Sequence, residues 1–278
     1  MHDQELQVRL DQDGFVVVPF LAPAVLDEVR AWRAAIGSAP GDPGIALFND
    51  TWSTERAHRA SVAEALGRWC QPAIDALLVD HVALAWTTIV KWPGEPGAVV
   101  AHRDPTFVDE AMFRSIGIWC PLEDVDAATG TLSVIPGSHR GGAPVRAHQA
   151  EANLLVDLDL RADPRLVQLD VPAGAAIVYD HALVHGSVAN GSDRPRVVVA
   201  GVLVPRAAEA RYAVQGPDGE VHDLAVGPEL FVDERLDQLD VDAVLGRYPE
   251  VGSPVATSSV APAPGRPARW WRRRRGAS

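Results

Sequence analysis

The sequence has little cysteine and no long apolar run. Its 278 residues include only two cysteines, Cys70 and Cys120, which form no C-x-x-C pattern and offer no disulfide framework. No apolar run approaches the roughly 20 residues that a membrane-spanning helix needs, and the polar N-terminus lacks the apolar core of a signal peptide. These absences argue against a disulfide-rich secreted scaffold and against a helical membrane protein. We expect a cytoplasmic protein without a transmembrane segment.

Basic residues are also scarce, and they are unevenly distributed. The net charge is −12, but residues 1–250 hold 19 basic against 37 acidic residues, a net charge of −18. A body this acidic is a poor partner for nucleic acid. Residues 251–278 instead contain six arginines and no acid among proline, alanine and serine, which predicts a disordered basic tail. We expect this tail to be dispensable, with anionic lipid, RNA or an acidic neighbouring surface as alternative partners.

The most informative motif is a histidine and an aspartate two residues apart, His102 and Asp104. They follow a predicted strand at 84–90, a turn at 92–97 and an extended stretch at 98–102. Residues i and i+2 of a strand point to the same face, so both side chains are expected to reach one metal ion. A second histidine, His185, lies far downstream. Two imidazoles and one carboxylate, with three coordination positions open, are the ligand set of non-haem Fe(II) oxygenases.

The hydrophobic pattern predicts a mainly β fold with helices (α+β). Strand-like segments dominate residues 82–204, and helical spacing marks 22–36 and 55–79. We predict a double-stranded β-helix (jelly-roll, cupin-like) core braced by these N-terminal helices, because two facing sheets bring distant residues to one inner wall. Residues 1–250 are predicted to be a single domain.

Two further segments are expected to border the cavity of this core. Residues 141–165 form a long connection and are the candidate substrate lid. Residues 206–250 are expected to form a C-terminal cover, whose apolar side comprises Leu230, Phe231, Leu236, Leu239, Val241, Val244 and Leu245.

The order of the motifs resembles the phytanoyl-CoA dioxygenase family of Fe(II)/2-oxoglutarate oxygenases. The resemblance covers about residues 5–205. It is carried by the strand at 13–21, His102-Arg103-Asp104, the segment at 119–122, the Pro-Gly-Ser-His turn within 130–139, Gly174, and the segment from His185-Gly186-Ser187 to Arg196. The resemblance implies a 2-oxoglutarate-dependent dioxygenase with a jelly-roll core.

The resemblance also implies that His102, Asp104 and His185 bind the iron. Taken alone, the first two have another interpretation, a packed or surface histidine and a turn aspartate. His181 competes with His185 as a ligand, but the Gly-Ser pair after His185 and its spacing to the downstream arginine favour His185. His139 is expected to be structural or to lie at the cavity rim.

For the co-substrate, the resemblance implies that Arg196 pairs with the distal carboxylate of 2-oxoglutarate. A guanidinium offers a rigid bidentate fork to a carboxylate, which suits this role. By similarity Ser187 helps to hold the co-substrate and Trp119 lines the same cavity. Lys91 or Thr88 is expected to supply a further polar contact, and the sequence does not choose between them.

The implied reaction is hydroxylation of an unactivated C–H bond in a small molecule, consuming O2 and 2-oxoglutarate and releasing succinate and CO2. Related halogenases lack the ligand carboxylate, so Asp104 favours hydroxylation over halogenation. Desaturation, epimerisation and ring formation use the same ligands and stay open. A non-oxidative jelly-roll metalloenzyme (isomerase or lyase) and a non-catalytic binding protein are the alternatives from other classes. The sequence specifies neither the substrate nor the oligomeric state.

Overall fold

Two antiparallel sheets form the body of the protein, which a computed structural model describes over residues 1–37, 46–94, 97–141, 145–148 and 154–251. The strands of the first sheet are β1 (Phe15–Pro19), β2 (Leu47–Asn49), β3 (His81–Lys91), β5 (Ile116–Pro121), β8 (Ala175–Asp180) and β10 (Arg196–Pro205). They are ordered β1-β8-β5-β10-β3-β2 and are called the major sheet. The minor sheet has the order β4-β9-β6-β7 and contains β4 (Val99–His102), β6 (Ser133–Val134), β7 (Val167–Gln168) and β9 (His185–Ser187).

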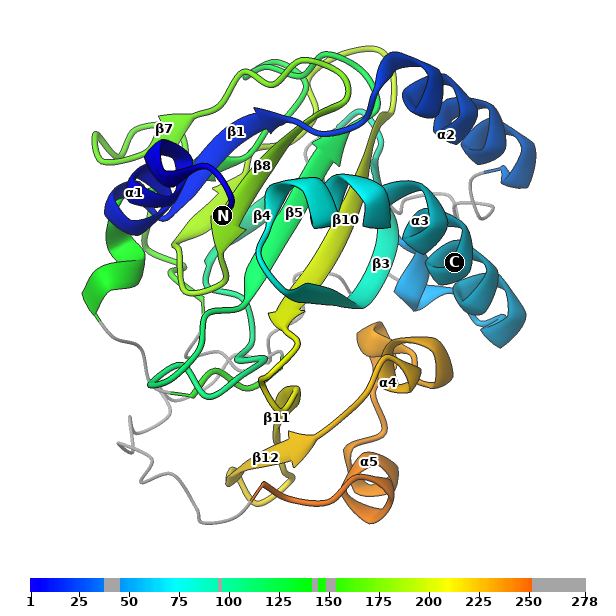
Figure 1. Cartoon of the computed structure of the whole chain (residues 1–278), viewed down its shortest axis with the longest axis vertical. Coiled ribbons are helices and arrows are strands. Elements are labelled where there is room, and N and C mark those ends of the chain that lie inside the picture. Colours follow the sequence, from blue (N-terminus) through cyan, green and yellow to red (C-terminus); the bar gives the residue numbers. More distant parts are fainter. Residues whose placement is uncertain (38–45, 95–96, 142–144, 149–153, 252–278) are drawn as a thin grey trace, which may run out of the picture.

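Three helices lie against the major sheet (Figure 1): α1 (Gln4–Asp13), α2 (Pro23–Ile36) and α3 (Arg56–Leu77). The last two confirm the helices predicted at 22–36 and 55–79. Helix α2 carries a proline in its first turn, where the missing N–H costs no hydrogen bond. Helix α1 was not predicted. Asp3 caps its N-terminus by accepting from the backbone N–H groups of Glu5 and Leu6, and Gly14 ends it in the left-handed region.

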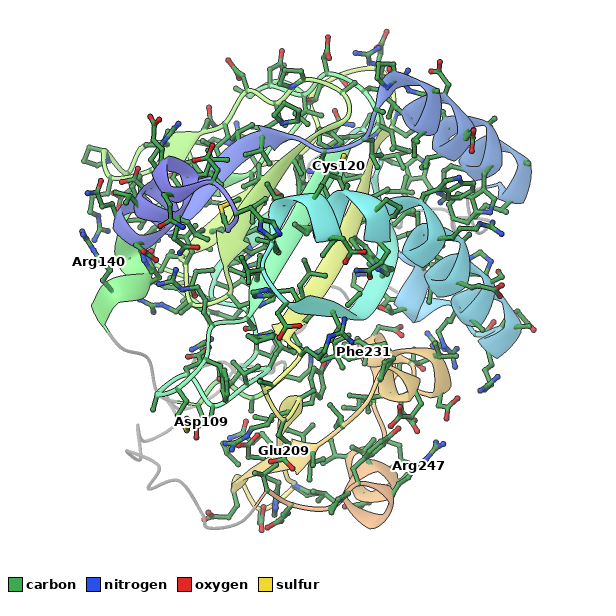
Figure 2. The ribbon with its side chains drawn as sticks, in the orientation of Figure 1. Asp109, Cys120, Arg140, Glu209, Phe231 and Arg247 are labelled. Carbon is green, nitrogen blue, oxygen red and sulfur yellow. The ribbon has the colours of Figure 1, made fainter. Side chains whose placement is uncertain are left out.

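The major sheet separates two apolar cores, because alternate residues of each strand point to opposite faces. On the helix-covered face, Cys120 (Figure 2) packs with Val199 and with residues of α2 and α3. On the inner face, Trp119 and Val198 pack with residues of the minor sheet such as Val134. The predicted jelly-roll is thereby confirmed, with a helix-braced outer face and an interior between the sheets.

The chain after β10 forms a hairpin, β11 (Arg211–Gln215) and β12 (Val221–Ala225), followed by α4 (Glu229–Asp233) and α5 (Val241–Arg247). The predicted apolar side of the C-terminal cover is confirmed, because three of its seven residues belong to one buried cluster with Phe107 of the loop after β4 and the other four pack against that cluster. Phe231 lies where α4 meets the end of the sheets (Figure 2). The hairpin was not predicted.

Some predictions lie outside the described residues. Of the predicted tail only Val251 is described, and the candidate lid at 141–165 is described only in part. The single domain over 1–250 stays a prediction. Among the helices that the structure describes, none is both long and apolar enough to cross a membrane.

Candidate metal centre and co-substrate pocket

His102 and His185 are brought together by strand pairing in the minor sheet. His102 ends β4, His185 begins β9, and the two residues are directly paired in the antiparallel register. Their ring centroids are 4.3 Å apart. Gly186 makes this approach possible, because a Cβ there would lie 2.9 Å from the carbonyl oxygen of Val99. Pairing between two short strands therefore unites two histidines that are remote in the sequence.

Asp104 completes a group of three side chains that converge on one point. Its carboxylate oxygens lie 3.5 Å from Nε2 of His102 and 3.7 Å from Nε2 of His185. One candidate ligand atom from each residue falls within a span of 4.8 Å, and the structure identifies the trio as able to hold a metal ion. The trio contains His185 rather than His181, as the sequence favoured.

The local placement of Asp104 differs from the sequence prediction. Strand β4 ends at His102, so Asp104 does not share a strand face with it. The aspartate lies in the following loop, which is held at both sides of the residue. Its backbone N–H donates to the carbonyl of His181 at 3.0 Å, and its own carbonyl accepts from Nε of Arg146 at 2.6 Å.

Both imidazoles are oriented by backbone carbonyls. Nδ1 of His102 lies 2.8 Å from the carbonyl oxygen of Val100, and Nδ1 of His185 lies 3.0 Å from that of Leu183. A carbonyl can only accept, so each Nδ1 carries a proton, and in the neutral ring Nε2 is then the nitrogen that can bind a metal. This tautomer is the one that a metal-binding histidine requires when Nε2 is the ligand atom.

The charge state of the trio also suits a metal. Burial alone would raise the pKa of Asp104, but the neighbouring His185 and His102 hold it well below its usual range, so the carboxylate is ionised. Burial lowers the pKa of His185, which favours the neutral imidazole that coordinates metals. Burial opposes protonation of His102, but its contacts with Asp104 outweigh burial and raise its pKa, so a bound metal would take the place of a proton there. Two imidazoles and one carboxylate form a donor set that fits Fe(II).

Tyr179 is a neighbour of the trio that the sequence did not reveal. Its hydroxyl donates to Oδ2 of Asp104 at 3.1 Å, and its ring centroid lies 5.0 Å from that of His185. Gly117 faces it on the adjacent strand, and a Cβ at Gly117 would lie 2.2 Å from the tyrosine ring. Burial, followed by the charge of Asp104, raises the pKa of Tyr179 well above its usual range, so it remains a donor.

The other two histidines singled out by the sequence have different partners. Nδ1 of His181 contacts Oγ of Ser115 at 2.9 Å, and burial lowers the pKa of His181 to about 4. His139 lies in a 3-10 turn (Ser138–Gly141), where its Nε2 is 3.2 Å from the carbonyl of Asp11. His139 is therefore packed against the N-terminal helix, which agrees with a structural role.

Two basic side chains lie next to each other on the inner face of the major sheet. Lys91 and Arg196 are directly paired across β3 and β10, and both are buried, at 0% and 5% exposure. Burying a charge without a counter-ion is costly. No acidic side chain among the described residues perturbs the pKa of either one, and burial lowers these pKa values to about 6 and about 9.

The predicted co-substrate residues gather around this pair. Nζ of Lys91 reaches across the interior to Oγ of Ser187, two residues past His185, and to the carbonyl of Val188 at 2.7 Å. The Arg196 guanidinium lies 5.1 Å from the Trp119 ring centroid. One of its Nη atoms donates to a backbone carbonyl, whereas its Nε is buried without a partner. A lysine and an arginine with no acidic partner among the described residues therefore lie in the interior close to Ser187, two residues past His185.

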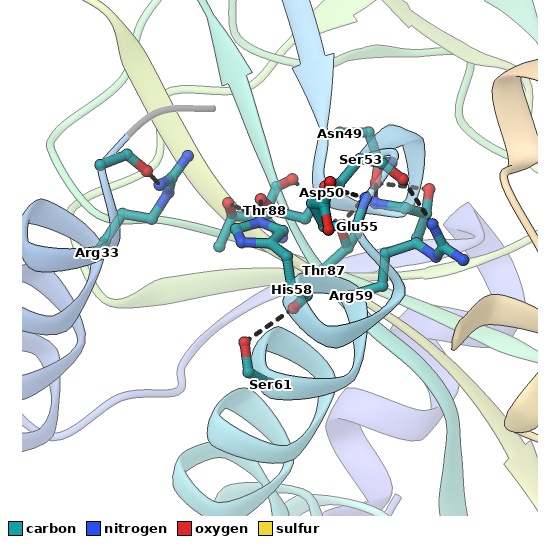
Figure 3. Close-up of polar contacts among 12 residues, drawn as sticks. Arg33, Asn49, Asp50, Ser53, Glu55, His58, Arg59, Ser61, Thr87 and Thr88 are labelled. Carbon is teal, nitrogen blue, oxygen red and sulfur yellow. Dashed lines mark hydrogen bonds and ion pairs between the residues drawn. The ribbon is translucent and has the colours of Figure 1, made fainter. Parts of the chain in front are cut away.

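Thr88 is not part of this pocket, and its assignment there is wrong. It lies on the opposite face of β3 from Lys91, where its backbone N–H and its hydroxyl both donate to the carboxylate of Asp50 (Figure 3). That carboxylate is 1% exposed and also contacts Nε2 of His58 at 2.8 Å. Strand alternation explains the difference, since positions 88 and 91 necessarily face opposite ways.

Arg146 is a second residue that the sequence did not single out. It is almost fully buried, and besides its contact with the Asp104 carbonyl it binds both carboxylate oxygens of Glu110. Glu110 is thus the partner that fixes this arginine. Arg146 belongs to the described part of the candidate lid, so that segment is linked to the backbone of a proposed metal ligand.

Comparisons with known proteins agree with this geometry. The family model for phytanoyl-CoA dioxygenase matches residues 10–198. Phytanoyl-CoA dioxygenase domain-containing protein 1 of Danio rerio is 36% identical over 44% of this chain and 44% of its own length. Phytanoyl-CoA dioxygenase 1 of Oryza sativa is 36% identical over 37% of each chain. The alignments thus span less than half of these relatives.

Solved structures share the fold at low sequence identity. HygX from Streptomyces hygroscopicus, crystallised with nickel, 2-oxoglutarate and hygromycin B, is 18% identical with a TM-score of 0.52 over 74% of this chain and 88% of that protein. The epimerase SnoN, solved with Fe3+, alpha ketoglutarate and nogalamycin RO, is 21% identical with a TM-score of 0.51 over 75% and 85%. Because the family model matches more than half of the sequence, this chain belongs to the phytanoyl-CoA dioxygenase family.

Proposed function

We propose that the protein is an Fe(II)- and 2-oxoglutarate-dependent dioxygenase that hydroxylates a small molecule. The observation that carries the proposal is one interior that holds both parts of such a site. A trio of His102, Asp104 and His185 is suited to Fe(II), and a buried cation pair without an acidic partner, Lys91 and Arg196, is suited to a dicarboxylate. A non-oxidative metalloenzyme would need the first but not the second.

In this proposal each residue has a defined task. The Nε2 atoms of the two histidines and one oxygen of Asp104 would hold Fe(II), which when bound supplies the O2-dependent decarboxylation of 2-oxoglutarate coupled to substrate oxidation. Arg196 and Lys91 would bind the distal carboxylate, with Arg196 kept rigid by its stacking on Trp119. The apolar interior between the sheets excludes water and so strengthens these charge interactions.

Hydroxylation is the proposed outcome because Asp104 is in place. With iron bound, its carboxylate would occupy the coordination position that a halide would need, and the hydroxyl of Tyr179 donates a hydrogen bond to it. The structural neighbour SnoN is an epimerase, so stereochemical inversion is the main competing outcome within the same family of reactions.

A coupled assay tests the proposed function. The purified protein is incubated with Fe(II), 2-oxoglutarate, O2 and a panel of small molecules, and succinate is measured together with the mass of each candidate substrate. We expect succinate release that requires all three additions, and a product heavier by one oxygen atom. Succinate at background level across conditions that saturate the protein with iron would refute the activity, and a product of unchanged mass would favour epimerisation.

The contact between Tyr179 and Asp104 yields a prediction about the metal. Tyr179→Phe removes one hydrogen bond from the proposed ligand and keeps the ring that fills the space over Gly117. We expect Fe(II) affinity to fall by about 10- to 100-fold, as is typical when a partner of a ligand is lost. Anaerobic metal titration measures it, with thermal unfolding of the metal-free protein as the control. Equal affinity in the variant and the unaltered protein would show that Tyr179 does not position the carboxylate.

A further inference from the structure

The buried amine of Lys91 has a hydrogen-bonding environment that matches its neutral form. An ammonium group has three donors, whereas a neutral amine has two. Two acceptors contact Nζ, the hydroxyl oxygen of Ser187 and the carbonyl oxygen of Val188. Among the residues that the structure describes, no third acceptor is available to it. The site as it stands therefore satisfies the hydrogens of the neutral amine and leaves one hydrogen of the ammonium form unpaired.

The groups around Lys91 disfavour its charged form, because they are neutral, apolar or positively charged. Arg196 faces it from β10 and carries the like charge, while the groups that contact Nζ, the hydroxyl of Ser187 in β9 and the carbonyl of Val188 just after it, are neutral. On the other flank β2 places Leu47 opposite it. Lys91 is 0% exposed, so water does not compensate for the absent counter-ion. Burial, and then the charge of Arg196, lowers its pKa to about 6, in agreement with this geometry.

A dicarboxylate bound beside Lys91 and Arg196 would instead favour the charged form of Lys91. Its distal carboxylate would supply the missing acceptor and the missing negative charge at the same time. An opposite charge within about 4–6 Å favours the charged form of a titrating group. The ammonium form of Lys91 is then the stable one, and the proton has to come from the solvent because no described acidic group adjoins the pair.

We propose that binding of 2-oxoglutarate to the Lys91–Arg196 pair is coupled to the uptake of one proton by Lys91. This inference rests on the proposed function, since it concerns how the same site takes its co-substrate. Arg196 provides the permanent charge that attracts the anion, and Lys91 provides a charge that exists only when the anion is present. The free pocket thereby avoids holding two like charges side by side in an apolar interior.

The sign of the pH dependence follows from this coupling. Below the pKa of the free site Lys91 is already protonated, and binding takes up no proton. Above it each binding event takes up one, so the association constant should fall by about tenfold per pH unit at alkaline pH. Without the coupling, the affinity would not change with pH in this range, because both carboxylates of 2-oxoglutarate are already ionised.

Isothermal titration calorimetry tests the proposal on the full-length protein saturated with Ni(II) in the absence of a reductant. The protein is saturated with metal beforehand, so that protons released from the histidines on metal binding are not counted in the titration with 2-oxoglutarate. Titrating 2-oxoglutarate at about pH 7.5 in two buffers of different ionisation enthalpy gives the number of protons exchanged. We expect close to one proton taken up per 2-oxoglutarate bound by the unaltered protein.

Two variants separate this proposal from its alternatives. Lys91→Arg keeps a permanent charge and should bind 2-oxoglutarate with no proton uptake. Lys91→Met, which also fits an apolar pocket, should bind at least about tenfold more weakly, again with no uptake. Tight binding without proton uptake by the unaltered protein, or the same uptake in either variant, would overturn the coupling and leave the proposed function intact. No binding of 2-oxoglutarate at all would overturn both.

Discussion

His185→Ala is expected to abolish metal binding, whereas His181→Ala is expected to preserve it. The two histidines lie on the same short segment and are both almost fully buried, but only Nε2 of His185 faces Asp104, at 3.7 Å. Losing a direct ligand should weaken Fe(II) binding by more than about a hundredfold, which exceeds the loss of an outer partner. Succinate formation should fall to background in the same variant.

The His181 variant is the matched control because it removes an imidazole from the same region. Its ring contacts Ser115 and packs edge-on against Tyr179, and its backbone carbonyl accepts from Asp104, a hydrogen bond that alanine retains. Anaerobic titration with Fe(II), followed by a second titration with 2-oxoglutarate, measures the affinity of both variants for the metal and for the co-substrate. Metal affinity lost in His181→Ala and retained in His185→Ala would reassign the third ligand.

The metal trio was predictable from the sequence because metal ligands are restricted to a few residue types, and these occur in short, recognisable motifs. A His-x-Asp pair, a later histidine and the arginine that follows it are recognisable as residue types in order, and the structure brings His102, Asp104 and His185 together. The physical reason first given for the pair was nevertheless incomplete. Asp104 reaches the site from a loop held by Arg146 and His181 rather than from a shared strand face.

Other parts of the site could not be predicted, because they depend on contacts between distant strands. Tyr179 and Arg146 contact Asp104 across long stretches of chain, and neither belongs to a local motif. Choosing between Thr88 and Lys91 required knowing which face of β3 is the inner one, and the hydrophobic pattern of a strand buried on both faces does not show this. The partner of Lys91, Arg196, becomes evident only from the register of β3 against β10.

Arg196→Met is expected to abolish co-substrate binding without harming the fold. Arg196 is buried, has no acidic partner among the described residues, and keeps its Nε unpaired. Methionine fills a similar volume beside Trp119 and removes a charge that is uncompensated in the free protein. Removing one partner of a buried ion pair costs about 3–5 kcal/mol. The dissociation constant for 2-oxoglutarate should therefore rise by about 10²- to 10⁴-fold.

The stability of the free Arg196→Met protein should not fall although its affinity for 2-oxoglutarate does, and this combination makes the prediction specific. Because burying an unpaired charge is unfavourable, the free variant should unfold at the same temperature as the unaltered protein or at a higher one. Adding 2-oxoglutarate to the metal-loaded forms should then raise the unfolding temperature of the unaltered protein only. Arg194→Met, at an exposed position two residues earlier, is the control and should bind 2-oxoglutarate normally. A variant at Arg196 that loses stability but keeps co-substrate affinity would assign this arginine to the fold rather than to the pocket.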